Sequence, residues 1–360
     1  MPSEPRDLSL PPPPAGPGPF DELRDLANED RGTPSPARRS GITVPGRRRG
    51  GIPIPSVEDN EKKGCTVLEL DGITKSYGGR RVLDDVGFTV APGRLTGFVG
   101  GNGAGKTTTM RIALGVLGKD AGSVTLAGAP VTAADRRRFG YMPEERGLYP
   151  KMKVAEHIAY LARLHGFSKA DATTKATALL ERLGLGERLG DLVETLSLGN
   201  QQRAQIAASL VHEPEVLILD EPFSGLDPLA VDVVAGVLQE KAAAGTAVLF
   251  SSHQLDVVER LCDDLVIIAG GTIRAAGTRD DLRAQHATHR YELVSRSDAG
   301  WLREEPGVTV IDFDGGYALF DADDDTTAQR VLQGAVSRGD VASFAPQRPT
   351  LAEIFKEVIQ

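Results

Sequence analysis

The sequence has little cysteine, no long apolar run and no excess of positive charge, and each shortage excludes a class of protein. Two cysteines in 360 residues, Cys65 and Cys262, are too few for a disulfide framework and fit a reducing cytosol. No run approaches the roughly 18 apolar residues that a membrane-spanning helix needs. The formal net charge is −9, so nucleic acid is not the expected partner. The composition therefore predicts a chain that is soluble by itself, and a partner can still hold such a chain at a membrane.

Residues 1–63 have a composition unlike the rest of the chain. They contain the stretches PPPPAGPGP and TPSPARRSG and few large apolar residues, so they cannot bury enough surface to offset the entropy of ordering. We expect a disordered tail and no signal peptide, because the start carries acid and no apolar segment follows. The arginine-rich residues 37–51 could contact anionic lipid or nucleic acid, but a solvated tail is favoured. A third interpretation is that the natural start lies further in.

Residues 64–286 alternate between apolar strand patterns and helical patterns. The expected strands are residues 66–73, 86–90, 94–100, 121–128, 138–142, 215–222 and 246–253, followed by two strands in 264–278 joined by a Gly-Gly turn. The expected helices are residues 107–117, 154–167 and 172–186. Such alternation predicts an α/β domain with a largely parallel sheet and ligands at the strand ends.

The order of expected strands and helices changes again at residue 287. Residues 290–297, 308–322 and 341–346 read as strands, and residues 326–339 and 350–359 read as helices. Thr350 and Glu353 have the spacing of a capping box for the last helix. Residues 287–360 are therefore expected to form a small α+β accessory domain, with no evident catalytic set.

The stretch GGNGAGKTTT, residues 100–109, is typical of a phosphate-binding loop. Gly100, Gly105, Lys106 and Thr107 fit the spacing G-x-x-x-x-G-K-[ST]. Glycines let backbone N–H groups approach an anion, and the helix that follows points its positive end at the same place. A flexible glycine-rich turn is the alternative, but the apolar strand before the loop and the helix after it favour a nucleotide. The residues expected to contact the nucleotide are Gly100, Gly101, Asn102, Gly103, Ala104, Gly105, Lys106, Thr107 and Thr108.

Within this loop Lys106 is expected to reach the β- and γ-phosphates, and the Thr107 hydroxyl to hold Mg²⁺. The stretch VLILDEP supplies a second candidate, because Asp220 and Glu221 end a buried strand. Adjacent carboxylates there are costly unless their charge is used. Asp220 can organise Mg²⁺ and Glu221 can act as general base toward water. Acids that merely cap a strand end are the alternative.

Three further motifs carry a family resemblance. LSLGNQQR (196–203), SGLD (224–227) and SSH (251–253) follow the P-loop in this order. The set resembles the ATP-binding subunits of ABC transporters over about residues 67–285. The resemblance implies an ABC-type nucleotide-binding domain with a helical subdomain, working as a homodimer or with a paired ATPase subunit. Each ATP then lies between the P-loop of one subunit and the LSLGN stretch of the other.

The resemblance also implies roles for single residues. Ser197 and Gly199 would contact the γ-phosphate across the dimer, His253 would sense that phosphate, and Asp227 would line the interface. Tyr77 matches the aromatic residue that stacks on adenine in this family; a tyrosine of the core is the alternative.

Two departures from the family pattern stand out. Glu144 replaces the usual glutamine of the loop after the GYMP strand, and it can still ligate Mg²⁺ or water. Leu198 and Asn200 replace a glycine and a glutamine of the usual LSGGQ. The form PEERGLYP resembles the ATPase subunits of sodium- and drug-efflux systems whose permeases are of the separate ABC-2 type.

The family resemblance thus implies an ATP-hydrolysing motor that drives a membrane permease, in the direction of export, from the cytoplasmic side of the cell membrane. A permease helix would dock near residues 145–185. The alternative is a non-transport ABC ATPase that acts on ribosomes or nucleic acid. One P-loop, one LSLGN stretch, a separation of about 90 residues between Lys106 and Ser197, and the lack of zinc-type cysteine pairs favour transport.

Overall fold

The structure is a computed structural model of the chain, and it describes residues 67–145, 147–286 and 289–359. The predicted tail, residues 1–63, lies outside the described residues, as does Cys65. Within the described ranges, none of the helices combines the length and the apolar character that crossing a bilayer requires.

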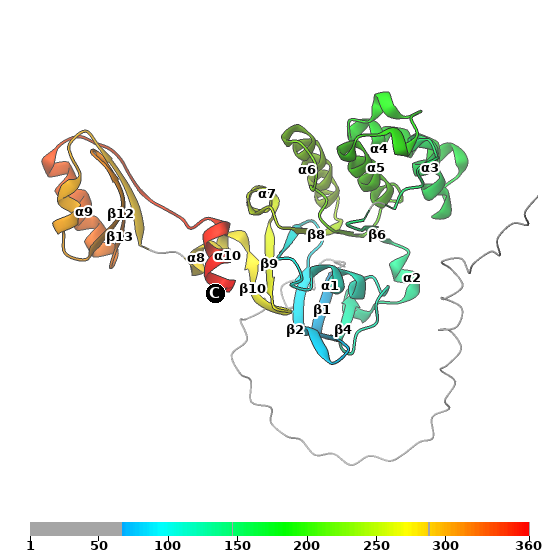
Figure 1. The fold of residues 1–360 in the computed structure, drawn as a ribbon, viewed down its shortest axis with the longest axis horizontal. Helices are drawn as coiled ribbons and strands as arrows, with labels where there is room; N and C mark the ends of the chain where they lie inside the picture. The colour runs from blue at the N-terminus through cyan, green and yellow to red at the C-terminus, as the bar shows by residue number, and fades with distance from the viewer. Residues whose placement is uncertain (1–66, 146, 287–288, 360) are drawn as a thin grey trace, which may run out of the picture. The chain divides into compact units, whose positions relative to one another are not determined.

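A six-stranded sheet positions the functional motifs (Figure 1). Its order is β10-β9-β3-β8-β7-β6, and all neighbours run parallel except the pair β9 and β10. The predicted, largely parallel sheet is therefore confirmed. The strands are β3 (Leu95–Val99), β6 (Phe139–Met142), β7 (Val216–Leu219), β8 (Ala247–Ser252), β9 (Asp264–Ala269) and β10 (Thr272–Thr278). Strands β3, β7 and β8 are buried on both faces, which explains their unbroken apolar sequences.

A second sheet is antiparallel, with the order β2-β1-β4-β5. Its strands are β1 (Leu68–Tyr77), β2 (Arg80–Val90), β4 (Ala121–Leu126) and β5 (Ala129–Pro130). Helix α1 (Lys106–Ala113) shares one apolar core with this sheet and with one face of the six-stranded sheet. Met110 and Ile112 of α1 are buried there. The P-loop helix is thus held between two sheets.

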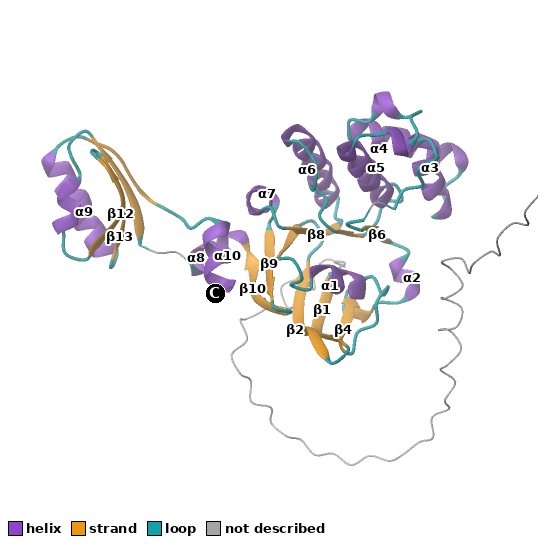
Figure 2. Cartoon of the chain, in the orientation of Figure 1, coloured by secondary structure: helices purple, strands orange, loops and turns teal. Residues whose placement is uncertain are grey.

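The other face of the six-stranded sheet is covered by helices (Figures 1 and 2). Those that contact its strands are α5 (Leu198–Leu210), α6 (Pro228–Ala243) and α7 (Leu255–Leu261). Helices α3 (Val154–Leu164) and α4 (Lys169–Arg182) join the same core through α5, and the short α2 (Ala133–Arg136), which precedes β6, has no buried residue. Helices α3, α4 and α5 pack on one another. Fully buried alanines, among them Ala162, Ala172 and Ala176, let these helices approach closely. This group is the expected helical subdomain.

Residues 290–346 form a sheet with the order β12-β13-β11-β14 and antiparallel neighbours. Its elements are β11 (Arg290–Ser295), the 3₁₀ helix η5 (Gly300–Glu304), β12 (Val308–Asp314), β13 (Tyr317–Ala322), α9 (Asp325–Arg338) and β14 (Val341–Pro346). Leu293, Phe320 and Val331 are fully buried in a core of its own. The ring centroids of Tyr291 and Phe344 lie 5.2 Å apart. A separate α+β core is therefore present.

The last helix, α10 (Leu351–Ile359), packs against the ATPase core. Leu351 and Ile354 are buried in the same cluster as α7 and as α8 (Arg279–Gln285). The predicted capping box is confirmed, because Thr350 N–H donates to Glu353 Oε2 at 2.8 Å and Glu353 N–H donates to Thr350 Oγ1 at 3.3 Å. The sequence groups α10 with residues 287–360, and the structure packs its buried side chains against α7, α8 and β10.

Candidate ATP-binding and hydrolysis site

The P-loop connects the buried strand β3 to helix α1. Gly103 and Gly105 have φ angles of 75° and 110°, which side chains with a Cβ rarely adopt. A Cβ on Gly100 would stand 2.5 Å from the carbonyl oxygen of Ile268. The N-cap residue of α1 is Gly105, which offers no capping side chain. The N–H groups of the first helical turn therefore remain available to an anion.

Lys106 begins α1 and is only 8% exposed. Its Nζ donates to the carbonyl oxygen of Gly100 at 2.7 Å and lies 4.0 Å from Oε1 of Glu221. The ammonium group is thus held at the point where the P-loop meets the acidic strand end. A positive charge placed there is suited to phosphate oxygens that arrive along the loop.

Asp220 and Glu221 follow β7 directly and are 1% and 8% exposed. Asp220 Oδ1 accepts a hydrogen bond of 2.6 Å from the Ser251 hydroxyl. The other oxygen, Oδ2, is buried and has no hydrogen-bond partner among the described residues. A buried carboxylate oxygen without a donor is costly, and a hydrated Mg²⁺ ion is a suitable neighbour for it.

No group of three or more His, Cys, Asp or Glu side chains in the described part of the chain is arranged to hold a metal ion. Mg²⁺ commonly keeps several waters and binds one or two protein groups together with substrate phosphates. The donors present here fit that mode: the Asp220 carboxylate, and the half-buried Thr107 near the start of α1. Glu144 lies exposed in the loop after β6.

His253 stands directly after β8, the strand that neighbours β7. Its Nδ1 lies 2.9 Å from Glu221 Oε2. Lys106, Glu221 and His253 come from three separate segments of the sequence, and the sheet brings them together at the carboxyl ends of its strands. This is the edge at which α/β sheets place their ligands.

The LSLGN stretch begins α5. The Ser197 side chain accepts from Asn200 N–H at 3.4 Å and so caps the helix. A Cβ on Gly199 would stand 3.3 Å from the carbonyl oxygen of Gly225, so a glycine suits this packing. Leu198 is exposed. The helix start therefore presents a serine and a glycine beside an apolar side chain that the usual family motif lacks.

Two other predicted residues have defined surroundings. Asp227 caps α6, because its Oδ1 accepts from Ala230 N–H at 2.8 Å. This structural role stands beside the interface role implied by the resemblance. Tyr77 is 49% exposed, with Lys75 Nζ 5.4 Å from the centre of its ring. The alternative of a core tyrosine is thus excluded, and the ring is free to stack.

Three polar residues of this region were given no role from the sequence. Ser251 contacts Asp220 and Glu221, Gln202 donates to the Glu221 carbonyl oxygen at 3.0 Å, and Gln205 donates to the Pro143 carbonyl oxygen at 2.7 Å. All three are almost fully buried. Ser251 and Gln202 stand inside motifs that the sequence had already marked, which is the signal that could have found them.

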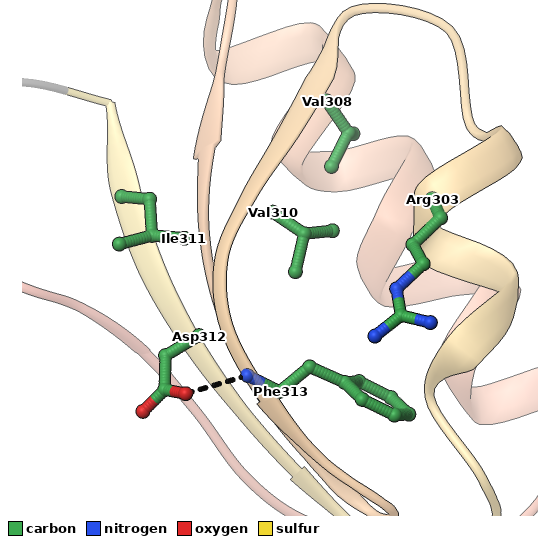
Figure 3. A pocket seen from close by; sticks show the side chains of 6 residues that line it. All are labelled: Arg303, Val308, Val310, Ile311, Asp312 and Phe313. Carbon is green, nitrogen blue, oxygen red and sulfur yellow. Dashed lines mark hydrogen bonds between the residues drawn. The ribbon is translucent and has the colours of Figure 1, made fainter.

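A pocket of about 410 Å³ in the C-terminal sheet is separate from this chemistry (Figure 3). It is lined by Arg303, Val308, Val310, Ile311, Asp312 and Phe313. Arg303 Cζ lies 4.4 Å from the centre of the Phe313 ring, and Asp312 Oδ1 accepts from Phe313 N–H at 2.9 Å. None of the predicted ATP-site residues lines this pocket.

Comparison with known proteins decides the family. The family model described as ABC transporter matches residues 83–224. The ABC transporter ATP-binding protein YhaQ of Bacillus subtilis is 36% identical over 296 residues, which cover 81% of this chain and 98% of that protein. The chain belongs to the ATP-binding subunits of ABC transporters. This ABC subunit therefore binds and hydrolyses ATP, as its family does.

Two further similarities describe the ABC subunit more closely. The linearmycin resistance ATP-binding protein LnrL of Bacillus subtilis is 35% identical, over 60% of this chain and 70% of that protein. A solved structure titled as the ATP-binding subunit of an ABC transporter is 35% identical, with a TM-score of 0.57, over 61% of this chain and 93% of that one. Residues 277–359 match the C-terminal domain of DrrA1-3-like ATP-binding proteins. That match begins in β10 and includes both α8 and α10.

Proposed function

We propose that this ABC subunit hydrolyses ATP within a dimer and drives a separate permease of the ABC-2 type as an exporter, from the cytoplasmic face of the cell membrane. The observation that carries the proposal is the convergence of Lys106, Glu221 and His253 at one strand edge beside the P-loop. These groups supply a phosphate-binding cation, a base and a polar contact for a terminal phosphate.

The proposed residue roles combine the geometry of the site with the family resemblance. The P-loop N–H groups and Lys106 bind the phosphates, and Thr107 and Asp220 would hold Mg²⁺, whose charge offsets that of the phosphate oxygens when it is bound. Glu221 accepts a proton from the attacking water. His253, anchored to Glu221, holds the γ-phosphate. Glu144 is a candidate contact for water near the metal, and Tyr77 stacks on adenine.

The second subunit completes each site in this proposal. Ser197 and Gly199 stand at a helix start, where N–H and hydroxyl donors suit a γ-phosphate that arrives from outside the chain. Asp227 is exposed at the start of α6, two residues after Gly225, whose carbonyl oxygen adjoins Gly199. The accessory domain, residues 287–360, is proposed to support or regulate the dimer.

The permease is proposed to dock on the helical subdomain. Tyr149, Tyr160 and Leu164 are exposed large apolar side chains of this region, and such exposure on a folded domain marks interaction surfaces when the side chains cluster. The loop between β6 and α3 contains Glu144, so docking on α3 can affect the ATP site through this loop. Export is favoured by the similarity to LnrL, which is named for linearmycin resistance.

A tagged pull-down from detergent-solubilised native membranes tests this function. A multi-span membrane protein recovered in near-equal amount supports it, and loss of that protein in Tyr160→Asp would place the contact on α3. The matched control is Val336→Asp, another exposed apolar position, on α9. Recovery of ribosomes or nucleic acid in place of a membrane protein would move the function to the non-transport class.

A further inference from the structure

The backbone of Glu221 is in the left-handed region, with φ of 51°. Three other non-glycine residues of the described chain share a positive φ: Asp85, Ala127 and Glu213. Those three are exposed, whereas Glu221 is buried. A strained conformation of this kind persists only when the surrounding structure fixes it, and such residues cluster at functional sites. The contacts around Glu221 must therefore hold its backbone in this conformation.

Ser251 holds the first side of the residue. Its hydroxyl oxygen accepts the Glu221 N–H at 2.9 Å and its hydroxyl proton goes to Asp220 Oδ1 at 2.6 Å. Since a backbone N–H can only donate, the direction of both bonds is settled. Ser251 is fully buried in β8, so no water competes for these bonds.

Gln202 holds the second side. Its Nε2 donates to the carbonyl oxygens of Glu221 and Pro222, at 3.0 and 3.1 Å. Gln202 lies on α5 and is 3% exposed. The N–H and the C=O of Glu221 are thus each bound by a buried side chain from a different element, one from the sheet and one from the helix.

We infer that Ser251 and Gln202 are positioning residues that clamp the backbone of Glu221 and so aim its carboxylate for hydrolysis. This inference rests on the proposed role of Glu221 as the general base. The clamp fixes the φ and ψ angles from which the side chain projects toward His253 and Lys106. Without it the backbone can relax toward a common conformation, which moves the carboxylate. Misplacement of a catalytic group by about 1 Å can lower a rate by about 100-fold.

The test is ATPase kinetics at saturating Mg²⁺, so that any loosening of Asp220 is compensated. Ser251→Ala and Gln202→Met are each expected to lower kcat by about 10- to 100-fold. KM and the Kd for ATP should change by no more than about twofold, because Lys106 and the P-loop are untouched and saturating Mg²⁺ offsets the lost contact to Asp220. Ser251→Thr keeps the hydroxyl and should recover a large part of the lost rate.

The matched control is Ser252→Ala. Ser252 is the next residue of β8 and is equally buried, but its hydroxyl accepts from Gln254 N–H, at 3.0 Å, and not from Glu221. The Ser252→Ala variant should hydrolyse ATP at the parent rate. An equal loss in Ser252→Ala and Ser251→Ala, or a loss expressed only as weaker ATP binding, would overturn the clamp.

A Glu221→Gln variant separates the clamp from the proposed function. If Glu221→Gln is inactive while Ser251→Ala and Gln202→Met both run at the parent rate, the clamp is wrong and the base assignment stands. If Glu221→Gln itself runs at the parent rate, the proposed role of Glu221 fails independently of the clamp.

Discussion

His253 Nδ1 lies 2.9 Å from Glu221 Oε2, while Lys106 Nζ lies 4.0 Å from Oε1 of the same carboxylate. One buried carboxylate is therefore shared between a residue that follows β8 and the first residue of α1. Because burial weakens solvent screening, a change in any one of these three groups alters the field at the other two. Binding and hydrolysis are expected to depend on them jointly.

Replacing Lys106 by alanine should abolish tight ATP binding. The ammonium group lies 2.7 Å from the carbonyl oxygen of Gly100, the first residue of the P-loop. Its loss removes the cation that would bind the phosphates and the positive charge beside Glu221. Titration with a fluorescent ATP analogue measures the effect. Arg111→Ala, in the last turn of the same helix, is the control for stability. An unchanged affinity in Lys106→Ala would contradict the P-loop assignment.

The Glu221→Gly variant should have a higher free energy of unfolding than the Glu221→Ala variant. Both substitutions remove the side chain, but alanine keeps the cost of the left-handed conformation, about 1 kcal/mol, and glycine does not. The usual order in helices is the reverse, with alanine favoured by about 1 kcal/mol. Urea unfolding of Glu221→Ala and Glu221→Gly measures the difference, and Ala243→Gly on α6 should show the usual order. Alanine more stable than glycine at 221 would mean that the backbone is not strained.

The free energy of unfolding should fall as the pH drops below about 6.5, the ordinary pKa of histidine. Burial, and then the neighbouring His165 ring at 3.9 Å, lower the pKa of His212 in the folded protein. Burial also lowers the pKa of His157. The unfolded chain thus binds more protons, so this part of the stability is present above the unfolded pKa and is lost progressively as the pH falls from there through the lower folded pKa.

Replacing His212 by glutamine should reduce that pH dependence. Glutamine offers an N–H for the Phe139 carbonyl oxygen, which His212 Nε2 contacts at 3.1 Å, but it does not titrate. Urea unfolding of the parent and His212→Gln at pH 7 and pH 5 measures the slope, and His157 is expected to keep a residual part. A slope identical to that of the parent would show that His212 does not contribute.

Truncating a buried side chain of α10 should destabilise the ATPase core, although the helix lies at the end of the sequence. Ile354→Ala is expected to cost about 2–5 kcal/mol, the usual range for a fully buried isoleucine. The matched control is Ile359→Ala, which is 42% exposed on the same helix and should cost no more than about 0.5 kcal/mol. Equal effects, measured by urea unfolding, would place α10 outside the core.

Local spacing explains how much of the fold and site could be predicted. Gly105, Lys106 and Thr107 are adjacent in sequence, so their pattern alone indicates a phosphate site, and the apolar runs indicate β7 and β8. The pairing of β1 with β2 and β4, and the packing of α10 against the ATPase core, depend on contacts between distant segments. No local pattern encodes such contacts.

The contact between Ser251 and Glu221 could not be predicted from local sequence either. Ser251 and Glu221 are 30 positions apart, and only the pairing of β7 with β8 brings them together. The left-handed backbone of Glu221 could not be predicted either, because glutamate has no preference for it. A buried serine inside a motif is the kind of residue whose role emerges only from its neighbours.

Size-exclusion chromatography with light scattering tests whether Glu221 is the base of an ATP site that two subunits complete. Glu221→Gln keeps the shape of the side chain but removes its charge and its basicity. With ATP and Mg²⁺ it should run as a dimer that persists, whereas the parent should return to its nucleotide-free state as ATP is consumed. A Glu221→Gln variant that hydrolyses ATP at the parent rate and forms no ATP-dependent dimer would show that Glu221 is not this base.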